Sequence, residues 1–319
     1  MASSASLIGL GGALAALAAC PFGLEFLRPA RPMRLNASDP GQFADLDCGR
    51  TYYRWRGPED GPVAVCIHGL TTPSYVWDPI AEWMAERGFR VLTYDLYGRG
   101  LTDPFRGPQT RATFCAQLEQ LLASLGVSSK FVLFGYSMGG GIAAAYAARH
   151  PKRLTGLCLI APVGFGHNLG WLSRFATCSG WVGHWAMVAF FPGQLRRATD
   201  ADRALPCPIP NMVDRQIDEA RWRGFAPTIL GSLKGLLSED FEPDHRAIAT
   251  AGVPCLTFWG AADTVIPLSG QQALALWNPA ARQVVLAGVP HSMAYTQSDR
   301  ITRLLVPWLT PALTSLPCN

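Results

Sequence analysis

The feature that most constrains the fold of this chain is an alternation between short apolar runs and longer segments with helical periodicity. Each run is short enough to form one strand and is followed by turn residues. Strands that are apolar along their whole length are typical of a mainly parallel sheet with helices on both faces. The strands are expected at residues 51–57, 62–69, 90–98, 130–137, 154–162, 254–260 and 282–288. The sequence therefore predicts an α/β fold.

The alternation is interrupted at residues 163–251, where helical patches dominate. An insertion there would form a helical cap over the carboxyl edge of the sheet, where ligands bind in open α/β sheets. We therefore predict a core of residues 31–162 and 252–319 with a cap at 163–251. Most cap aromatics are expected to pack the cap onto the core, and the alternative is that residues 165–191 form an apolar pocket wall. The aromatics concerned are Phe165, Trp171, Phe175, Trp181, Trp185, Phe190, Phe191 and Trp222.

Composition limits the partners that the protein can have. Hydrophobic residues make up 49% of the chain and charged residues 16%, so it can bury a large core. The net charge of +4 is small and the arginines are scattered, which argues against a nucleic-acid partner. The nine cysteines are well separated and form no metal-binding motif, so no metal is expected. Several lie in apolar runs, as Cys66, Cys158 and Cys255 do, and we interpret most as reduced core residues of a cytosol-facing body.

The apolar segment 1–30 is open to three interpretations. It carries no charged side chain before Glu25 and includes SLIGLGGALAALAAC, which is short for a spanning helix and lacks the basic start of a signal peptide. Its LAAC, ending at Cys20, also resembles a bacterial lipoprotein box. The pattern favours membrane association of some kind, followed by a soluble helix packed on the body and then by a cleaved secretory signal.

The segment GYSMGG places Ser137 between Gly135 and Gly139, directly after an apolar strand and before a helix. This context is that of a nucleophile elbow, in which the serine hydroxyl projects from a sharp turn above the sheet edge. The glycines are expected because a Cβ at either position would collide with the neighbouring strand or helix. The N–H of Met138, at the amino end of the helix, can stabilise an oxyanion.

A nucleophilic serine needs a base, and the base needs an orienting acid. Asp263 follows one predicted strand and His291 follows the next, so both are expected at the same sheet edge as Ser137 and in the chain order serine, acid, histidine. The other downstream histidines, at 150, 167, 184 and 245, are expected to be surface or packing residues.

The loop after residues 63–67 supplies a second oxyanion donor. Gly69 permits a tight turn, and the N–H of Leu70 is expected to face the same carbonyl as that of Met138. His68 lies upstream of the serine and is expected to hold the loop rather than to transfer a proton. Asp95 and Arg99 lie in a glycine-containing turn and are expected to hold it structurally.

Five segments together resemble the α/β-hydrolase fold superfamily, namely HGLTTPSYVW, YDLYGRGLTD, GYSMGG, GAADTVIP and GVPHSM. The resemblance covers residues 50–310. Within the superfamily, the chain resembles the capped serine esterase and monoacylglycerol-lipase-like branch, which also resembles carbon–carbon-bond hydrolases. It departs from haloalkane dehalogenases and epoxide hydrolases, which use an aspartate where this chain has Ser137. It also departs from many relatives after the histidine, where AYTQSD replaces an acidic residue and a proline.

The residues and the resemblance together imply a hydrolase of small carboxylic esters with a Ser137–His291–Asp263 triad, a lipophilic acyl or alcohol group and no cofactor. Two alternatives remain open. The same triad serves carbon–carbon-bond hydrolysis or cyanohydrin chemistry, and the same fold serves non-catalytic receptors or scaffolds. No feature of the sequence predicts the natural substrate or the oligomeric state.

Overall fold

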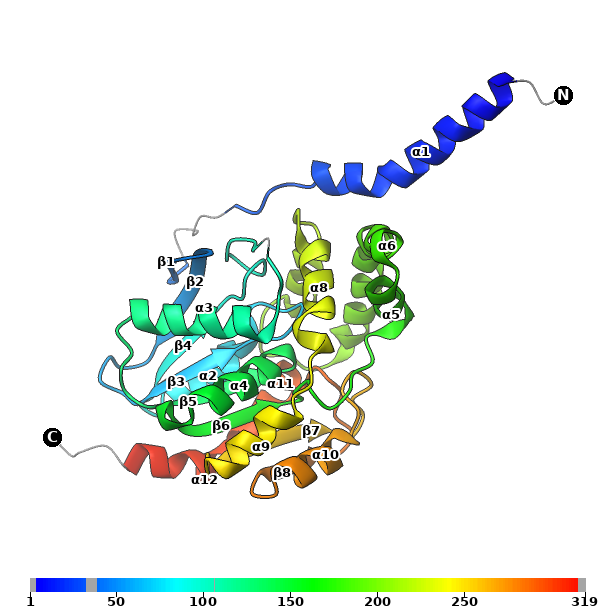
Figure 1. Ribbon diagram of the computed structural model, residues 1–319. Coiled ribbons are helices and arrows are strands. Elements are labelled where there is room, and N and C mark those ends of the chain that lie inside the picture. Colours follow the sequence, from blue (N-terminus) through cyan, green and yellow to red (C-terminus); the bar gives the residue numbers. More distant parts are fainter. Residues whose placement is uncertain (1–3, 33–38, 106, 315–319) are drawn as a thin grey trace.

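The computed structural model describes residues 4–32, 39–105 and 107–314, and its centre is an eight-stranded sheet with the strand order β1-β2-β4-β3-β5-β6-β7-β8 (Figure 1). The strands from β3 to β8 are parallel to one another, while β1 pairs antiparallel with β2 and β2 antiparallel with β4. The strands are β1 Gln42–Leu46, β2 Gly49–Arg56, β3 Val63–Ile67, β4 Arg90–Tyr94, β5 Phe131–Tyr136, β6 Leu154–Ile160, β7 Cys255–Gly260 and β8 Arg282–Leu286. The predicted α/β fold is confirmed.

Strand β1 is the strand that the apolar pattern did not predict. It lies at the edge of the sheet and pairs only with β2, and four of its five side chains are exposed or half-buried. A strand with so little burial lacks the continuous apolar run by which the others are recognised.

Helices cover both faces of the sheet, and successive side chains along a strand point alternately into the two cores on either side. On β5, Phe131 and Leu133 pack into the core beneath α3, α4, α9 and α10, whereas Val132 and Phe134 pack into the core beneath α2 and α12. These helices are α2 Asp78–Ala85, α3 Arg111–Ser124, α4 Met138–Arg149, α9 Glu242–Thr250, α10 Gly270–Trp277 and α12 Ser298–Thr314. The last segment contains two helices, the short α11 Met293–Thr296 and α12, which are separated by Gln297.

The cap consists of α5 Gly170–Cys178, α6 Gly180–Asp200, α7 Met212–Glu219 and α8 Phe225–Lys234 (Figure 1). Helix α9 falls within the predicted cap range, yet it packs against α4 and α10 of the core. The expectation that most cap aromatics pack inward is wrong for Trp171, Phe175, Trp181 and Phe190, whose side chains are exposed. They lie on α5 and α6, whose buried positions are occupied mainly by smaller side chains such as Leu172, Ala176, Ala186 and Met187.

Helix α1, Ser4–Leu27, extends away from the body, and its carboxyl end contacts the cap (Figure 1). The Phe22 ring contacts the Trp181 ring at a tilt, with centroids 5.6 Å apart, and the Glu25 carboxylate accepts a 2.6 Å hydrogen bond from the N–H of Gly224. Just beyond the helix, Arg31 forms a two-bond ion pair with Glu219. Within the described residues, we find no helix with the length and apolar character needed to cross a membrane.

Candidate active site

Ser137 lies at the direct junction between strand β5 and helix α4. It caps the helix, and its backbone has φ 53° and ψ −118°. Residues other than glycine rarely adopt a positive φ, and such strain is typical of functional positions. The strained turn presents the hydroxyl at the carboxyl edge of the sheet, as the elbow pattern predicts.

The glycines on either side of Ser137 are required by close packing. A Cβ at Gly135 would lie 2.4 Å from the carbonyl oxygen of Gly139, and one at Gly139 would lie 2.2 Å from the carbonyl oxygen of Ile67. Both obstacles are backbone atoms, which cannot move aside cheaply. The serine is therefore placed by direct contact of the elbow with helix α4 and with the end of strand β3.

The structure brings Ser137, His291 and Asp263 into one hydrogen-bonded line. His291 Nε2 is 3.0 Å from Ser137 Oγ, and His291 Nδ1 is 2.8 Å from Asp263 Oδ2. The other carboxylate oxygen, Asp263 Oδ1, accepts 2.8 Å hydrogen bonds from the N–H groups of Val265 and Ile266. With its proton on Nδ1, the imidazole presents a lone pair to the serine hydroxyl, which is the arrangement a general base requires.

Tyr136 holds the histidine loop against the elbow. Its ring stacks on His291 at 5.4 Å between centroids, and its hydroxyl donates a 3.0 Å hydrogen bond to the carbonyl of His291. Burial raises the pKa of this phenol, so the hydroxyl remains a donor. Tyr136 thus fixes both the ring plane and the backbone of His291.

The loop after β3 passes close to the nucleophile, and His68 fixes the direction of one of its peptides. His68 Nδ1–H donates to the carbonyl of Gly69 at 2.8 Å, while Nε2 accepts from the N–H of Leu96 at 2.8 Å. Burial lowers the pKa of His68 to about 3, so the ring is neutral. The Gly69 carbonyl and the Leu70 N–H belong to the same planar, trans peptide and point in opposite directions. Because the Gly69 carbonyl faces the His68 ring, the Leu70 N–H faces away from that ring.

The structure confirms a structural part for Asp95 and Arg99. The Asp95 carboxylate accepts 2.8 Å hydrogen bonds from the N–H groups of Ser74 and Leu101, and burial raises its pKa to about 6. The buried Arg99 donates to the carbonyls of Leu70 and Tyr97. Neither side chain lines the pocket around the serine.

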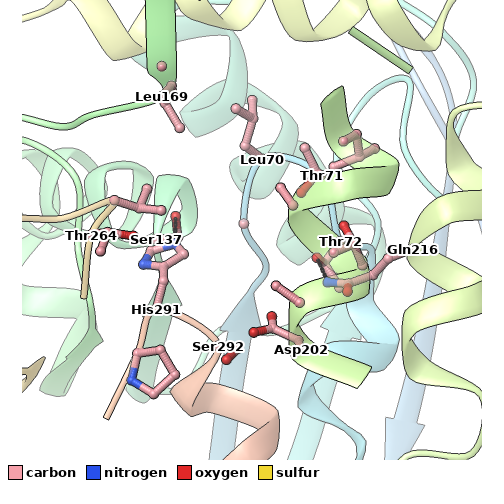
Figure 2. A pocket seen from close by; sticks show the side chains of 18 of the residues that line it. Leu70, Thr71, Thr72, Ser137, Leu169, Asp202, Gln216, Thr264, His291 and Ser292 are labelled. Carbon is pink, nitrogen blue, oxygen red and sulfur yellow. Dashed lines mark hydrogen bonds between the residues drawn. The ribbon is translucent and has the colours of Figure 1, made fainter. Parts of the chain in front are cut away.

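A pocket of about 610 Å³ opens above Ser137 between the core and the cap (Figure 2). Leu70 and Leu169 lie at one end of the pocket in Figure 2, the apolar end, where apolar side chains predominate, and Asp202 and Ser292 lie at the other end. Helix α6 lines the pocket with a single face. That face and its continuation contribute Phe191, Gln194, Leu195, Ala198, Thr199, Ala201 and Asp202.

The four other histidines downstream of Ser137 do not line the pocket around it. His150 pairs with Glu119, and His245 is buried among aromatic rings. Neither of these, nor His167 or His184, lines the pocket. Among the described residues, no group of three or more His, Cys, Asp or Glu side chains is placed to hold a metal ion. Cys318 lies outside the described residues.

Several pocket residues were not identified from the sequence. Tyr136 occupies the variable position between the first glycine and the serine of the elbow, which is the one signal that could have indicated it. Asp202 and Gln216 have no local motif, because their approach to the serine depends on how the cap folds over the sheet. Tyr295 lies on the short core helix α11, four residues after His291.

Comparison with known proteins identifies the family to which this site and fold correspond. A family model for the alpha/beta hydrolase fold matches residues 62–297. The chain is 29% identical over 276 residues to the dihydrolipoyllysine-residue acetyltransferase component of the acetoin cleaving system of Cupriavidus necator. The match covers 83% of this chain and 67% of that protein. It is 25% identical to the pimeloyl-[acyl-carrier protein] methyl ester esterase of Aliivibrio salmonicida, over 81% of this chain and 95% of the esterase.

A solved structure shares the fold over nearly the whole chain. A membrane phospholipase A described as a bacterial virulence factor superposes with a TM-score of 0.69 at 21% identity, covering 98% of both chains. That coverage is wide enough to include part of α1 as well as the core and the cap.

Proposed function

The chain belongs to the α/β-hydrolase fold family, and from this membership and its site geometry we propose that it is a serine hydrolase of carboxylic esters. The observation that carries the proposal is the position of His291. One ring nitrogen faces the Ser137 hydroxyl, the other faces the buried carboxylate of Asp263, and Ser137 and His291 line the pocket in which a substrate would bind.

In the proposed reaction, Ser137 Oγ attacks the ester carbonyl while His291 Nε2 takes the hydroxyl proton. Asp263 orients the imidazole and stabilises its protonated form. The N–H groups of Leu70 and Met138 bind the oxyanion. His291 then protonates the leaving alcohol, and water, deprotonated by the same histidine, hydrolyses the acyl-enzyme. The scheme uses no metal and no organic cofactor.

The apolar end of the pocket is proposed to hold the acyl group, and this proposal predicts a preference for medium chains. Leu70, Leu169, Phe191, Leu195 and Ile229 line the pocket, and each methylene buried there contributes about 0.8 kcal/mol. We expect kcat/KM for p-nitrophenyl esters to rise from acetyl to butyryl or hexanoyl, and then to level or fall. The measurement is kcat/KM for the C2, C4, C6, C8 and C12 esters.

The same assay separates the alternatives. A steady decline of kcat/KM from the acetyl ester onward would contradict a lipophilic acyl pocket. Turnover of a vinylogous diketone with no turnover of any ester would favour the carbon–carbon-bond hydrolase. Folded protein that hydrolyses neither substrate and does not react with a serine-directed fluorophosphonate would favour a scaffold.

A further proposal concerns association with a membrane surface. Among the described residues, nine of the twelve large hydrophobic side chains that are exposed lie on α1, α5 and α6. They are Leu17, Leu24, Phe26, Leu27, Trp171, Phe175, Trp181, Val182 and Phe190. Exposed aliphatic and aromatic side chains concentrated in this way are typical of surfaces that insert into the lipid interface. The membrane phospholipase A that superposes on this chain has the same overall fold.

Replacing Leu24, Leu27 and Trp171 together by serine is expected to lower the bound fraction on phosphatidylglycerol–phosphatidylethanolamine vesicles by at least about tenfold. These side chains are 60%, 76% and 68% exposed, so the fold and the hydrolysis of a soluble short-chain ester should be retained. Leu276→Ser is the matched control, because Leu276 is 72% exposed on α10 of the core. Equal vesicle binding by the wild type and the triple variant in a sedimentation assay would contradict the proposal.

A further inference from the structure

The end of the pocket opposite Leu169 contains a group of polar side chains that the proposed acyl transfer does not use. This polar cluster consists of Thr72, Asp202, Gln216, Ser292 and Tyr295, all of which line the pocket. Asp202 and Gln216 come from the cap, whereas the other three come from the core. Figure 2 shows Asp202, Gln216, Thr72 and Ser292 gathered on the side of the pocket that faces away from Leu169.

Two hydrogen bonds join the cap and core members of the polar cluster. The Tyr295 hydroxyl donates to Asp202 Oδ2 at 2.9 Å, and Gln216 Nε2 donates to Thr72 Oγ1 at 2.5 Å. Burial raises the pKa of Tyr295, which keeps its hydroxyl a donor. The bond to Asp202 uses the single donor of Tyr295, and the bond to Thr72 uses one of the two N–H groups of Gln216.

Two buried oxygen atoms of residues that line this end of the pocket have no hydrogen-bond partner in the described chain. These atoms are Gln216 Oε1 and Ser292 Oγ. Both residues are buried, with exposed fractions of 6% and 2%. Asp202 forms no ion pair with any Arg, Lys or His in the described chain. Buried polar atoms in native proteins nearly always have a partner, so these atoms point to a ligand.

The polar side chains at the other end of the pocket differ in this respect. Ser173 and Gln194 donate to the carbonyl of Leu169, and Asn168 accepts from the N–H of Gly170. None of the three has a buried polar atom without a partner. Among the residues that line the pocket, the buried polar atoms without a partner therefore all belong to the polar cluster.

We propose that the polar cluster is the subsite for the leaving alcohol, and that Asp202 and Gln216 select alcohols that carry further hydroxyl groups and no negative charge. The inference rests on the proposed ester hydrolysis. A carboxylate and an amide oxygen accept hydrogen bonds, so they bind O–H donors, and the carboxylate repels an anionic group. Because α6 runs from Phe191 at the apolar end to Asp202 just past its last turn, the acyl chain and the alcohol would lie on opposite sides of Ser137.

The test compares three octanoyl esters that differ only in the alcohol, namely propyl, 2,3-dihydroxypropyl and carboxymethyl octanoate. The Asp202→Asn variant is expected to lower the kcat/KM ratio of the dihydroxypropyl to the propyl ester by roughly tenfold or more, since hydrogen bonds to a charged acceptor are the strong ones. It should raise the ratio of the carboxymethyl to the propyl ester by several-fold. Asparagine can still accept the Tyr295 bond, so the link between cap and core is kept.

Asp200→Asn is the matched control, because Asp200 is exposed, pairs with Arg203 and does not line the pocket. Both ratios should match those of the wild type in this variant. If Asp202→Asn changes all three esters by one common factor, the residue serves only to link cap and core, and the subsite proposal is overturned. A wild-type protein that fails to hydrolyse even propyl octanoate would instead overturn the proposed ester hydrolysis, and the subsite with it.

Discussion

Ser137→Ala is expected to abolish ester hydrolysis while the fold remains intact. The change removes one oxygen atom, and alanine tolerates the positive φ of the elbow about as well as serine does. Without Oγ no acyl-enzyme can form, and loss of the nucleophile in a serine hydrolase triad costs about 10⁶ in kcat. The rate should be measured with p-nitrophenyl butyrate, together with the circular dichroism spectrum and the thermal midpoint.

A serine-directed fluorophosphonate supplies an independent readout of the same residue. The wild type should be labelled and Ser137→Ala should not. Ser173→Ala is the control from the same pocket, since Ser173 is buried and its hydroxyl bonds to the carbonyl of Leu169. This control should keep its label. Undiminished turnover by folded Ser137→Ala would show that the elbow serine is not the nucleophile.

The parts of the fold that the sequence predicts are those that leave a local pattern. Buried parallel strands such as β3, β5 and β7 are apolar along their length, so they could be recognised, and Ser137 and Asp263 follow two of them. His291 follows β8, a partly exposed edge strand that still ends in a short apolar run. Because parallel strands place their carboxyl ends along one edge, position after a strand was enough to predict proximity.

The parts that the sequence does not predict depend on three-dimensional contacts. Strand β1 is stabilised by pairing with β2 and lacks a buried pattern of its own. The exposure of Trp171 and Phe190 follows from which face of the cap helices turns outward, and amphipathic spacing does not distinguish an inner apolar face from an outer one. Asp202 and Gln216 reach the pocket through the path of the cap, and neither has a motif in its neighbourhood.

The second large loss of activity is expected for Asp263→Asn, and the hydrogen bonds of Asp263 explain why. Asp263 Oδ1 accepts from the N–H groups of Val265 and Ile266, and Oδ2 accepts from His291 Nδ1–H. In Asp263→Asn the amide oxygen must take the place facing the two N–H groups, because an amide NH2 cannot accept their hydrogen bonds. The NH2 group then faces His291.

An amide donor facing Nδ1 favours the imidazole tautomer that carries its proton on Nε2. In that tautomer the nitrogen beside Ser137 Oγ, 3.0 Å away, has no lone pair with which to take the hydroxyl proton. We expect kcat to fall by about 10⁴, as it does for the wrong tautomer in serine proteases, with little change in KM. Asp299→Asn, an exposed aspartate in the first turn of α12, should keep its activity. A near-normal rate in Asp263→Asn would require another acid, yet the end of strand β6, the other usual place for one, reads Ala161-Pro162 and offers no carboxylate.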